Sequence, residues 1–494
     1  MQHVVVELFI WALGLCIGSF LNVVVYRLAV GLSITNPVRS FCPRCRADIA
    51  WYDNIPVLSW VILGGRCRHC RATISVQYPL VEALTGLTFV LVYHLLFVSG
   101  ARVGLVPAHL PGDIPILLAW LVLAAGLVAC SAMDIVSYTV DIRVTNFVLG
   151  VGVVLHALWP NDAFIVPRAT TAATGAAVAV FLASIVLLWW TLWRHADDEP
   201  GDESQHDSDA DQALPESKVA RFAACLGTAV FVAFAIWLMY LAFRPATGPA
   251  AGGLPVAAAL VSIFTAIVLI GGQQRPADDE IKAAIDEEQP HARRGALREL
   301  LWLSPAIVAG VLIFCAIEWV PGVRDAWRAA VQWSPGGGFA PVAGAAFAIH
   351  GAMIGAAAGW VARIVFTLAF GREAFGTGDI YILAAAGAVT GWDIVLLGLL
   401  LAVFMALGGV VVGLLLKTTA IIPLGPWLAL GFLWALWWNE PARHYAKPYV
   451  ASIVHLWHTN PLMLFVAAGL ILVAAGASIP LSRLLRKTIV PDSE

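Results

Sequence analysis

Two sets of residues in this sequence have types and spacings that can do chemistry. The first is a pair of Cys-x-x-Cys motifs, Cys42 with Cys45 and Cys67 with Cys70, separated by 21 residues. Each motif can place two thiolates on one tight turn, and two such turns supply the four sulfurs of a tetrahedral zinc site. A site closed by four cysteines leaves no open position for a substrate, so we expect the zinc to be structural.

Disulfides and free thiols are the alternatives for these four cysteines. Arginines flank both motifs and favour thiolates. The segment is also expected to lie in the cytoplasm, where disulfides are rare, and zinc is therefore favoured. The remaining cysteines occur singly in apolar runs and are expected to be small buried hydrophobes: Cys16, Cys130, Cys225 and Cys315.

The second set is two aspartates at the ends of apolar segments, Asp134 and Asp379. Ionisable residues at the edge of a membrane span are rare and indicate function by default. If the two carboxylates meet, one can take a proton from water while the other donates a proton to a scissile carbonyl. Gly376 and Gly378 precede Asp379 and would let the backbone turn sharply and a substrate strand approach. The sequence therefore predicts a peptide-hydrolysing pair.

Helix capping is the alternative for each aspartate taken singly. Asp141 and Asp393 are interpreted as caps only. A Gly-x-Gly-Asp motif is weak evidence by itself, so the argument depends on both carboxylates reaching one face of the membrane.

Composition identifies the elements that must position these residues. The chain has 494 residues, of which 60% are hydrophobic and 12% charged, whereas a soluble domain has about 25% charged residues. Apolar blocks of about twenty residues are long enough to cross a bilayer. The sequence predicts an all-α, polytopic membrane bundle with the lipid bilayer as its surroundings. The net charge of −3 and the lack of a basic block exclude a nucleic-acid partner.

About thirteen transmembrane helices are predicted. They cover 4–26, 77–98, 114–132, 144–160, 169–193, 220–243, 251–272, 301–320, 342–370, 380–392, 394–416, 420–438 and 461–482. The 380–392 helix is short and rich in Ala and Gly, so we expect it to be buried among other helices. The first apolar run lacks the basic start of a cleavable signal peptide and is expected to remain as an anchor.

The arginines of the short loops predict the orientation. Seven arginines lie between the first and second helices, which puts the four-cysteine segment in the cytoplasm. The chain is then a multi-pass protein of the inner (cytoplasmic) membrane, with the N-terminus outside and the C-terminus inside. The same scheme brings Asp134 and Asp379 to the cytoplasmic face.

The predicted organisation has six parts in chain order. They are the first helix (1–30), the cytoplasmic four-cysteine domain (31–76), a first membrane part (77–160), an insertion (161–341), a second membrane part (342–438) and an extra C-terminal helix with its tail (439–494). Within the insertion, residues 195–217 hold nine acids and no Lys or Arg, as is typical of a disordered linker. A short surface helix is expected around Asp278–Glu288.

Several segments together resemble the type IV prepilin peptidase family of bifunctional leader peptidases. They are GSFLNVVVYRL (18–28), the stretch from Cys42 to Cys70 with WYDNIPVLSW (51–60), QYPLVEALTG (77–86), Asp134, EAFGTGD (373–379) and IIPLGPWLALG (421–431). By this resemblance Asp134 and Asp379 are the catalytic aspartates. Glu82 holds a recurrent acidic position, with substrate binding, orientation of the cysteine domain and a plain helix-end ion pair all left open.

The resemblance implies cleavage of a basic leader from prepilin or pseudopilin substrates at the cytoplasmic face, within pilus or secretion machinery. It also implies N-methylation of the new N-terminus with S-adenosylmethionine. Cleavage has more support from the residues, because no glycine-rich nucleotide-binding loop is readable. Three features depart from the family pattern: Val140-Asp141-Ile142 after the first aspartate, Tyr381 after the second, and the 245 positions between the aspartates.

Two other functions remain open. The first is an intramembrane protease of the presenilin or signal-peptide-peptidase kind, which also uses Gly-x-Gly-Asp but has a Tyr before its other aspartate, where this chain has Met133. The second is a non-enzymatic transporter or secretion-assembly subunit on the same scaffold, for which the insertion and Tyr381 are the reasons. The insertion is expected to carry four helices, and an even number returns Asp379 to the side of Asp134.

Overall fold

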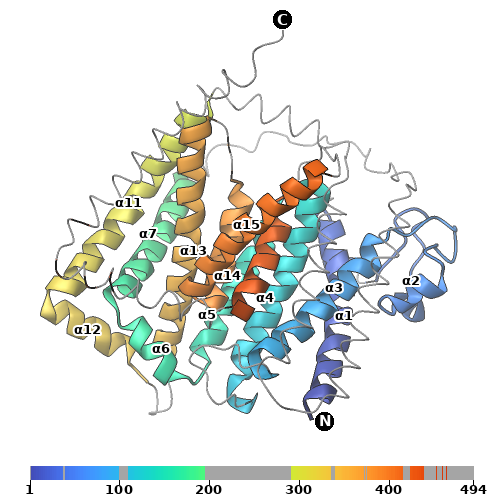
Figure 1. The fold of residues 1–494 in the computed structure, drawn as a ribbon, viewed down its shortest axis with the longest axis horizontal. Coiled ribbons are helices and arrows are strands. Elements are labelled where there is room, and N and C mark those ends of the chain that lie inside the picture. Colours follow the sequence, from blue (N-terminus) through green and yellow to red (C-terminus); the bar gives the residue numbers. More distant parts are fainter. Residues whose placement is uncertain are drawn as a thin grey trace, which may run out of the picture.

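The computed structural model describes most of the chain. The described residues are 2–29, 31–36, 39–98, 110–194, 291–334, 340–371, 373, 375–415 and 423–438, with single positions between 452 and 463. Across these ranges the chain forms helices joined by turns, and the only β-structure is two isolated bridges in the four-cysteine domain. The predicted all-α class is confirmed (Figure 1).

The described residues form twelve labelled α-helices. In chain order they are α1 (Gln2–Ala29), α2 (Leu58–Ile62), α3 (Gln77–Tyr93), α4 (Leu110–Ser137), α5 (Ile142–Ala157), α6 (Asp162–Ala169), α7 (Ala172–Arg194), α11 (Ala292–Trp319), α12 (Pro321–Val331), α13 (Pro341–Phe370), α14 (Thr377–Thr390) and α15 (Trp392–Leu415). A 3-10 turn, η1 (Trp51–Asn54), precedes α2, and a π-helical turn, η2 (His94–Val98), continues α3. A further helix covers 425–438.

Ten of the predicted spans coincide with these helices. The predicted spans 220–243, 251–272 and most of 461–482 lie outside the described residues, as do the acidic linker 195–217 and the surface helix at Asp278–Glu288. Within the described ranges, seven helices are long and apolar enough to cross a membrane, while α5 and α14 are apolar but shorter. The chain is therefore a multi-pass membrane protein.

Two helices of the insertion were not predicted, and a third starts early. α6 and α12 are short, and α12 carries Arg324, Asp325 and Arg328, so neither has the long apolar run used to find spans. α11 begins at Ala292 instead of 301, because Arg-rich turns extend the apolar helix at its N-terminus. These helices add a polar margin to the bundle without changing its class.

α13 occupies the middle of the bundle. It lies between the inserted helices α7 and α11 and the group formed by α4, α5 and α14 (Figure 1), and its most extensive packing is against α14. The four-cysteine domain with α2 lies at the opposite edge, beyond α1 and α3. The helices that carry the two aspartates thus lie inside the bundle and not at its rim.

α14 is buried among other helices, as its composition predicts. Apart from Tyr381, every residue from Ile380 to Thr390 is buried. Three glycines at helical spacing on α13, Gly351, Gly355 and Gly359, face it. A Cβ at Gly351 would overlap the carbonyl of Gly387, so the two backbones pass in direct contact.

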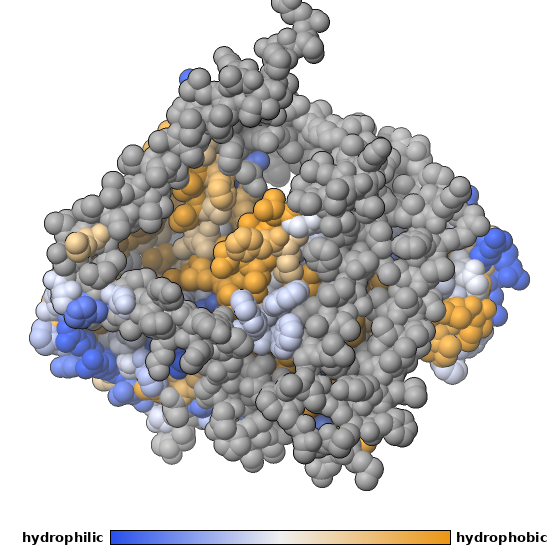
Figure 2. All heavy atoms as spheres, in the orientation of Figure 1, coloured by the Kyte–Doolittle hydropathy of each residue, from blue (hydrophilic) through white to orange (hydrophobic). Residues whose placement is uncertain are grey.

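α15, in contrast, exposes a continuous apolar stripe. Its exposed large side chains recur at helical spacing and are Leu396, Leu400, Val403, Phe404 and Leu407. Figure 2 shows apolar side chains gathered over the middle of the visible face, where α13 and α15 lie. An exposed stripe of this kind is typical of a lipid-facing helix.

The close approach of α13 to α14 predicts the effect of a single methyl group. In Gly355→Ala the new Cβ would overlap the carbonyl of Leu383, and we expect the free energy of unfolding to fall by about 1–3 kcal/mol. Gly150→Ala is the matched control, since no atom lies within 4 Å of its added Cβ and the better helix propensity of Ala should leave stability equal or higher. Thermal unfolding of both variants in detergent measures the difference, and equal midpoints would contradict the packing.

Candidate functional site

The four-cysteine domain brings its two motifs together. The sulfurs of Cys42, Cys45, Cys67 and Cys70 all lie within 4.8 Å of one another, and the Cys42 and Cys70 sulfurs are 3.9 Å apart. A tetrahedral zinc with bonds of about 2.3 Å requires sulfur–sulfur distances of about 3.8 Å. The four thiols therefore have the spacing that a zinc ion needs.

The two motifs are built as copies of one turn. In the first, the Cys42 N–H donates to Ala47 O, the Arg46 N–H donates to Cys42 O, and Arg46 has a φ of 59°. In the second, Cys67, Ala72 and Arg71 repeat these bonds, and Arg71 has a φ of 58°. One bridge, Phe41 to Asp48 or Arg66 to Thr73, closes each turn. This short repeat, Cys-x-x-Cys-Arg-Ala, was missed by the sequence analysis although it can be read 25 positions apart.

The thiols of the cluster differ in how readily they ionise. Backbone N–H groups of Cys70 and His69 lower the pKa of Cys67 to about 7, mainly through the first of these bonds. Burial raises the pKa of Cys42 to about 11. A divalent cation among the four sulfurs would offset the cost of a thiolate at Cys42, so the donor set fits zinc.

Glu82 ties this domain to the membrane helices. Its Oε2 accepts the Val57 N–H at 2.6 Å, where Val57 has a φ of 60° just before α2. The side chain of Ser19 also bonds Glu82. A Cβ at Gly18 would lie 2.6 Å from the Glu82 Cα, so α1 passes close to α3 at this point. Of the roles left open for Glu82, these contacts support orientation of the cysteine domain.

Asp134 lies near the C-terminal end of α4 and is 8% exposed. Its Oδ2 accepts the Gly425 N–H at 2.8 Å, in the first turn of the 425–438 helix. A Cβ at Gly425 would lie 2.7 Å from the same oxygen, so the contact requires glycine. The N-terminus of a helix favours a negative charge, and a chain segment 291 positions away thereby stabilises this carboxylate.

Asp379 lies in the first turn of α14 and is partly exposed. Its carboxylate accepts the N–H of Gly376, the N-cap residue. This bond is the capping interaction that was the alternative for a single aspartate. Asp141 also caps, as predicted, by accepting the Arg143 N–H at 2.8 Å and pairing with the Arg143 guanidinium at 2.6 Å.

Capping does not account for the position of Asp379 beside Asp134. The two carboxylates lie close enough for their charges to repel, although 245 positions separate them in the sequence. Gly378 provides the approach, because a Cβ there would lie 2.9 Å from the Cβ of Val140, in the turn that follows α4. Such repulsion disfavours ionisation of both carboxylates at once.

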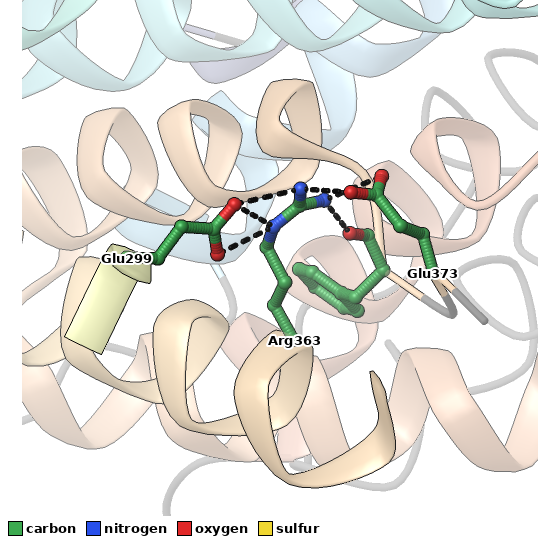
Figure 3. A network of polar contacts seen from close by, with 4 residues as sticks. Glu299, Arg363 and Glu373 are labelled. Carbon is green, nitrogen blue, oxygen red and sulfur yellow. Dashed lines mark hydrogen bonds and ion pairs between the residues drawn. The ribbon is translucent and has the colours of Figure 1, made fainter. Parts of the chain in front are cut away.

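A buried charged group that was not singled out from the sequence holds the loop before Asp379. Arg363 of α13 is 6% exposed and lies between Glu299 of α11 and Glu373 of the loop before α14 (Figure 3). Its Nη1 also donates to the Phe375 carbonyl at 2.8 Å. A charged residue inside the predicted 342–370 span was a readable signal, but its partners come from segments far away in the sequence.

Comparison with known proteins agrees with the resemblance found in the sequence. Residues 12–96 match the family model of the bacterial peptidase A24 N-terminal domain. In the structure, the matched residues comprise most of α1, the four-cysteine domain and α3, and they include the Glu82 contact that joins these parts.

The relatives that the chain matches are named for leader processing. A prepilin leader peptidase/N-methyltransferase of Myxococcus xanthus is 60% identical over 81 residues, which are 16% of this chain and 24% of that protein. A type 4 prepilin-like proteins leader peptide-processing enzyme of Escherichia coli is 36% identical over 193 residues, 36% of this chain and 64% of that protein. A Burkholderia pseudomallei prepilin leader peptidase/N-methyltransferase is 32% identical over 206 residues, which are 37% of this chain and 58% of that protein.

The chain thus matches less than two thirds of the length of each of these relatives. No solved structure matches it significantly. The resemblance to the type IV prepilin peptidase family is confirmed at this level.

The cysteine geometry predicts a metal content. Purified chain should carry about one zinc ion, and Cys42→Ser should remove most of it because three sulfurs bind zinc far less tightly than four. Cys315→Ser, a single cysteine of α11, is the matched control and should retain zinc. Mass spectrometry of the metal content measures both, and a chelator should make residues 31–76 sensitive to protease. Zinc bound equally by both variants would place the metal elsewhere.

Proposed function

We propose that the chain is an intramembrane aspartic endopeptidase that cleaves the basic leader of type IV prepilin-like proteins at the cytoplasmic face of the inner membrane. The observation that carries the proposal is the electrostatic interaction between the Asp134 and Asp379 carboxylates. The two residues are 245 positions apart in the sequence, yet their charges interact. Burying a carboxylate within a membrane bundle costs free energy, so such residues are usually functional. The names of the relatives support the substrate class.

In the proposed mechanism the two aspartates act as a unit that holds one proton. The ionised carboxylate takes a proton from a water molecule placed between the two, and the water oxygen attacks the scissile carbonyl. The protonated carboxyl donates to the carbonyl oxygen as it becomes tetrahedral. Collapse of this intermediate breaks the C–N bond as the proton taken from water passes to the leaving amine, and a hydroxyl of the intermediate gives its proton to the other carboxylate as the new carbonyl forms. The pair then returns to its starting state.

Backbone groups would keep the pair in position through these steps. Gly425 N–H holds Asp134 and Gly376 N–H holds Asp379, and neither donor has a side chain that could move. Donors fixed before the reaction need no reorganisation during it. The glycines at 376, 378 and 425 also permit this arrangement, because a Cβ at each would meet an aspartate carboxylate or Val140.

The bifunctional name of the relatives extends the proposal to N-methylation of the new N-terminus with S-adenosylmethionine. In the proposal, zinc keeps the four-cysteine domain folded at the edge of the bundle, and Glu82 fixes its orientation. Prepilins or pseudopilins are the proposed substrates, and the pilus or secretion machinery is the setting. The non-enzymatic transporter or assembly subunit is the competing function.

Replacement of either aspartate tests the dyad. Asp134→Asn and Asp379→Asn should each lower the rate of leader cleavage by about 100- to 10,000-fold, because amides cannot exchange the proton. Asp141→Asn is the matched control: it is a nearby cap, Asn caps a helix as well as Asp does, and cleavage should persist. The measurement is cleavage of a prepilin by purified chain in lipid, with membrane insertion checked for each variant. Retained cleavage in either of the first two variants would refute the dyad, and a wild-type chain that cleaves no prepilin would favour the non-enzymatic alternative.

A further inference from the structure

The inserted segment contacts the buried arginine that holds the loop before Asp379. Glu299 lies on α11, within residues that the family resemblance does not cover, and contacts Arg363 of α13 across the helix interface. The Glu299 carboxylate accepts from Arg363 Nη2 at 3.0 Å and from Nε at 3.1 Å. This is a two-bond contact of a guanidinium with a carboxylate, the geometry that fixes both side chains most strongly.

The other side of the same guanidinium holds the loop before α14. Arg363 Nη1 donates to Glu373 Oε2 at 3.0 Å and to the Phe375 carbonyl at 2.8 Å, and Nη2 pairs with Glu373 Oε1. Figure 3 shows Arg363 in the middle, with Glu299 on one side and Glu373 on the other. Both partners of the loop lie within six residues of Asp379.

One peptide group connects this contact to the aspartate. The Phe375 carbonyl accepts from Arg363, and the N–H of the same peptide, that of Gly376, donates to the Asp379 carboxylate. Hydrogen bonds at the two ends of a peptide strengthen one another, because each polarises the group for the other. The rotation of this peptide, and with it the placement of Asp379, therefore depends on the guanidinium.

A second contact from α11 fixes the start of the loop. Arg293 Nε donates to the Leu368 carbonyl at 3.1 Å, near the end of α13. Gly371, which ends α13 with a φ of 72°, faces the same guanidinium: a Cβ there would lie 3.3 Å from Arg293 Nη2. α11 thus contacts the end of α13 directly, through Arg293, and the loop before α14 indirectly, through Arg363.

We propose that the inserted helix α11 is a positioning element of the aspartate site, with Glu299 acting through Arg363 on the Phe375–Gly376 peptide. The inference rests on the proposed peptidase function. It assigns the insertion a role in placing Asp379, in place of the lipid-facing extension that its sequence would otherwise indicate. Glu299 and Arg363 are positioning residues, since neither contacts the aspartate itself.

The test uses the full chain in lipid nanodiscs with a prepilin substrate. Arg363→Gln should lower kcat by about ten- to a hundredfold, because a small displacement of a reacting group is enough for that loss, with KM changed by less than about twofold. Glu299→Gln should give a smaller fall in kcat, since Glu373 still pairs with Arg363. In the Arg363→Gln background, Glu299→Gln should have no further effect, because its route to the site is already lost.

Amide hydrogen exchange at Gly376 gives a second readout that does not depend on turnover. Exchange should be faster than in the wild type in both single variants. Glu318→Gln is the matched control, the same substitution at the other end of α11, and should leave kcat and exchange unchanged. If Arg363→Gln does not accumulate in membranes, Arg363→Lys, which keeps the charge but not the fork of donors, should show the same fall in kcat.

The outcomes separate this inference from the function on which it rests. If Asp379→Asn is inactive while Glu299→Gln keeps wild-type kcat and Gly376 exchange, the positioning role is overturned and the dyad stands. Independent, multiplying effects of the Glu299 and Arg363 substitutions would also overturn the route through Arg363. If Asp379→Asn still cleaves, the proposed function itself fails.

Discussion

The approach of two carboxylates inside an apolar bundle is the constraint on which the rest of the structure depends. Each carboxylate loses water when it is buried, and the two repel each other, so the arrangement persists only if donors and close packing offset both costs. The structure supplies a backbone N–H to each: Gly425 to Asp134 and Gly376 to Asp379. Both donors belong to helix N-termini, where N–H groups lack partners within the helix.

Close helix packing is the means by which these N-termini reach the carboxylates. α14 is short and almost entirely buried, and it contacts α13 through glycines whose backbones touch. Gly378 likewise lets the start of α14 press against Val140, just beyond α4. Because any side chain at these positions would separate the helices, glycine at the interfaces and the meeting of the aspartates are parts of one arrangement.

The insertion takes part in this arrangement instead of lying apart from it. A guanidinium buried on α13 must be compensated, and Arg363 finds one carboxylate on the inserted α11 and another beside the Gly-x-Gly-Asp loop. Burial of a charge thus couples two segments that have no sequence relation. At the other edge of the bundle, Glu82 couples the four-cysteine domain to α1 and α3 in a similar way, by accepting a backbone N–H.

The sequence by itself determined the fold class of the protein and the residues whose side chains could take part in metal binding or catalysis. Apolar runs of membrane length predicted ten of the described helices to within several residues, the Ala and Gly content of 380–392 predicted its burial, and two Cys-x-x-Cys motifs predicted one four-sulfur cluster. These features are local, since hydropathy, helix length and motif spacing act over a few turns of chain. The polar short helices α6 and α12 escaped prediction for the same reason, because they lack such runs.

Only the tertiary structure decided which distant groups meet. Three contacts depend on how the helices pack. Asp134 accepts from Gly425 N–H, one peptide group bonds both Arg363 and Asp379, and Arg363 pairs with Glu299 of the insertion. Glu299 and Arg363 can be read in the sequence, but the residues within a few turns of either do not predict that the two pair. In a bundle of apolar helices, burial makes an unpaired charge too costly to tolerate, and the packing of the helices selects the group that compensates it.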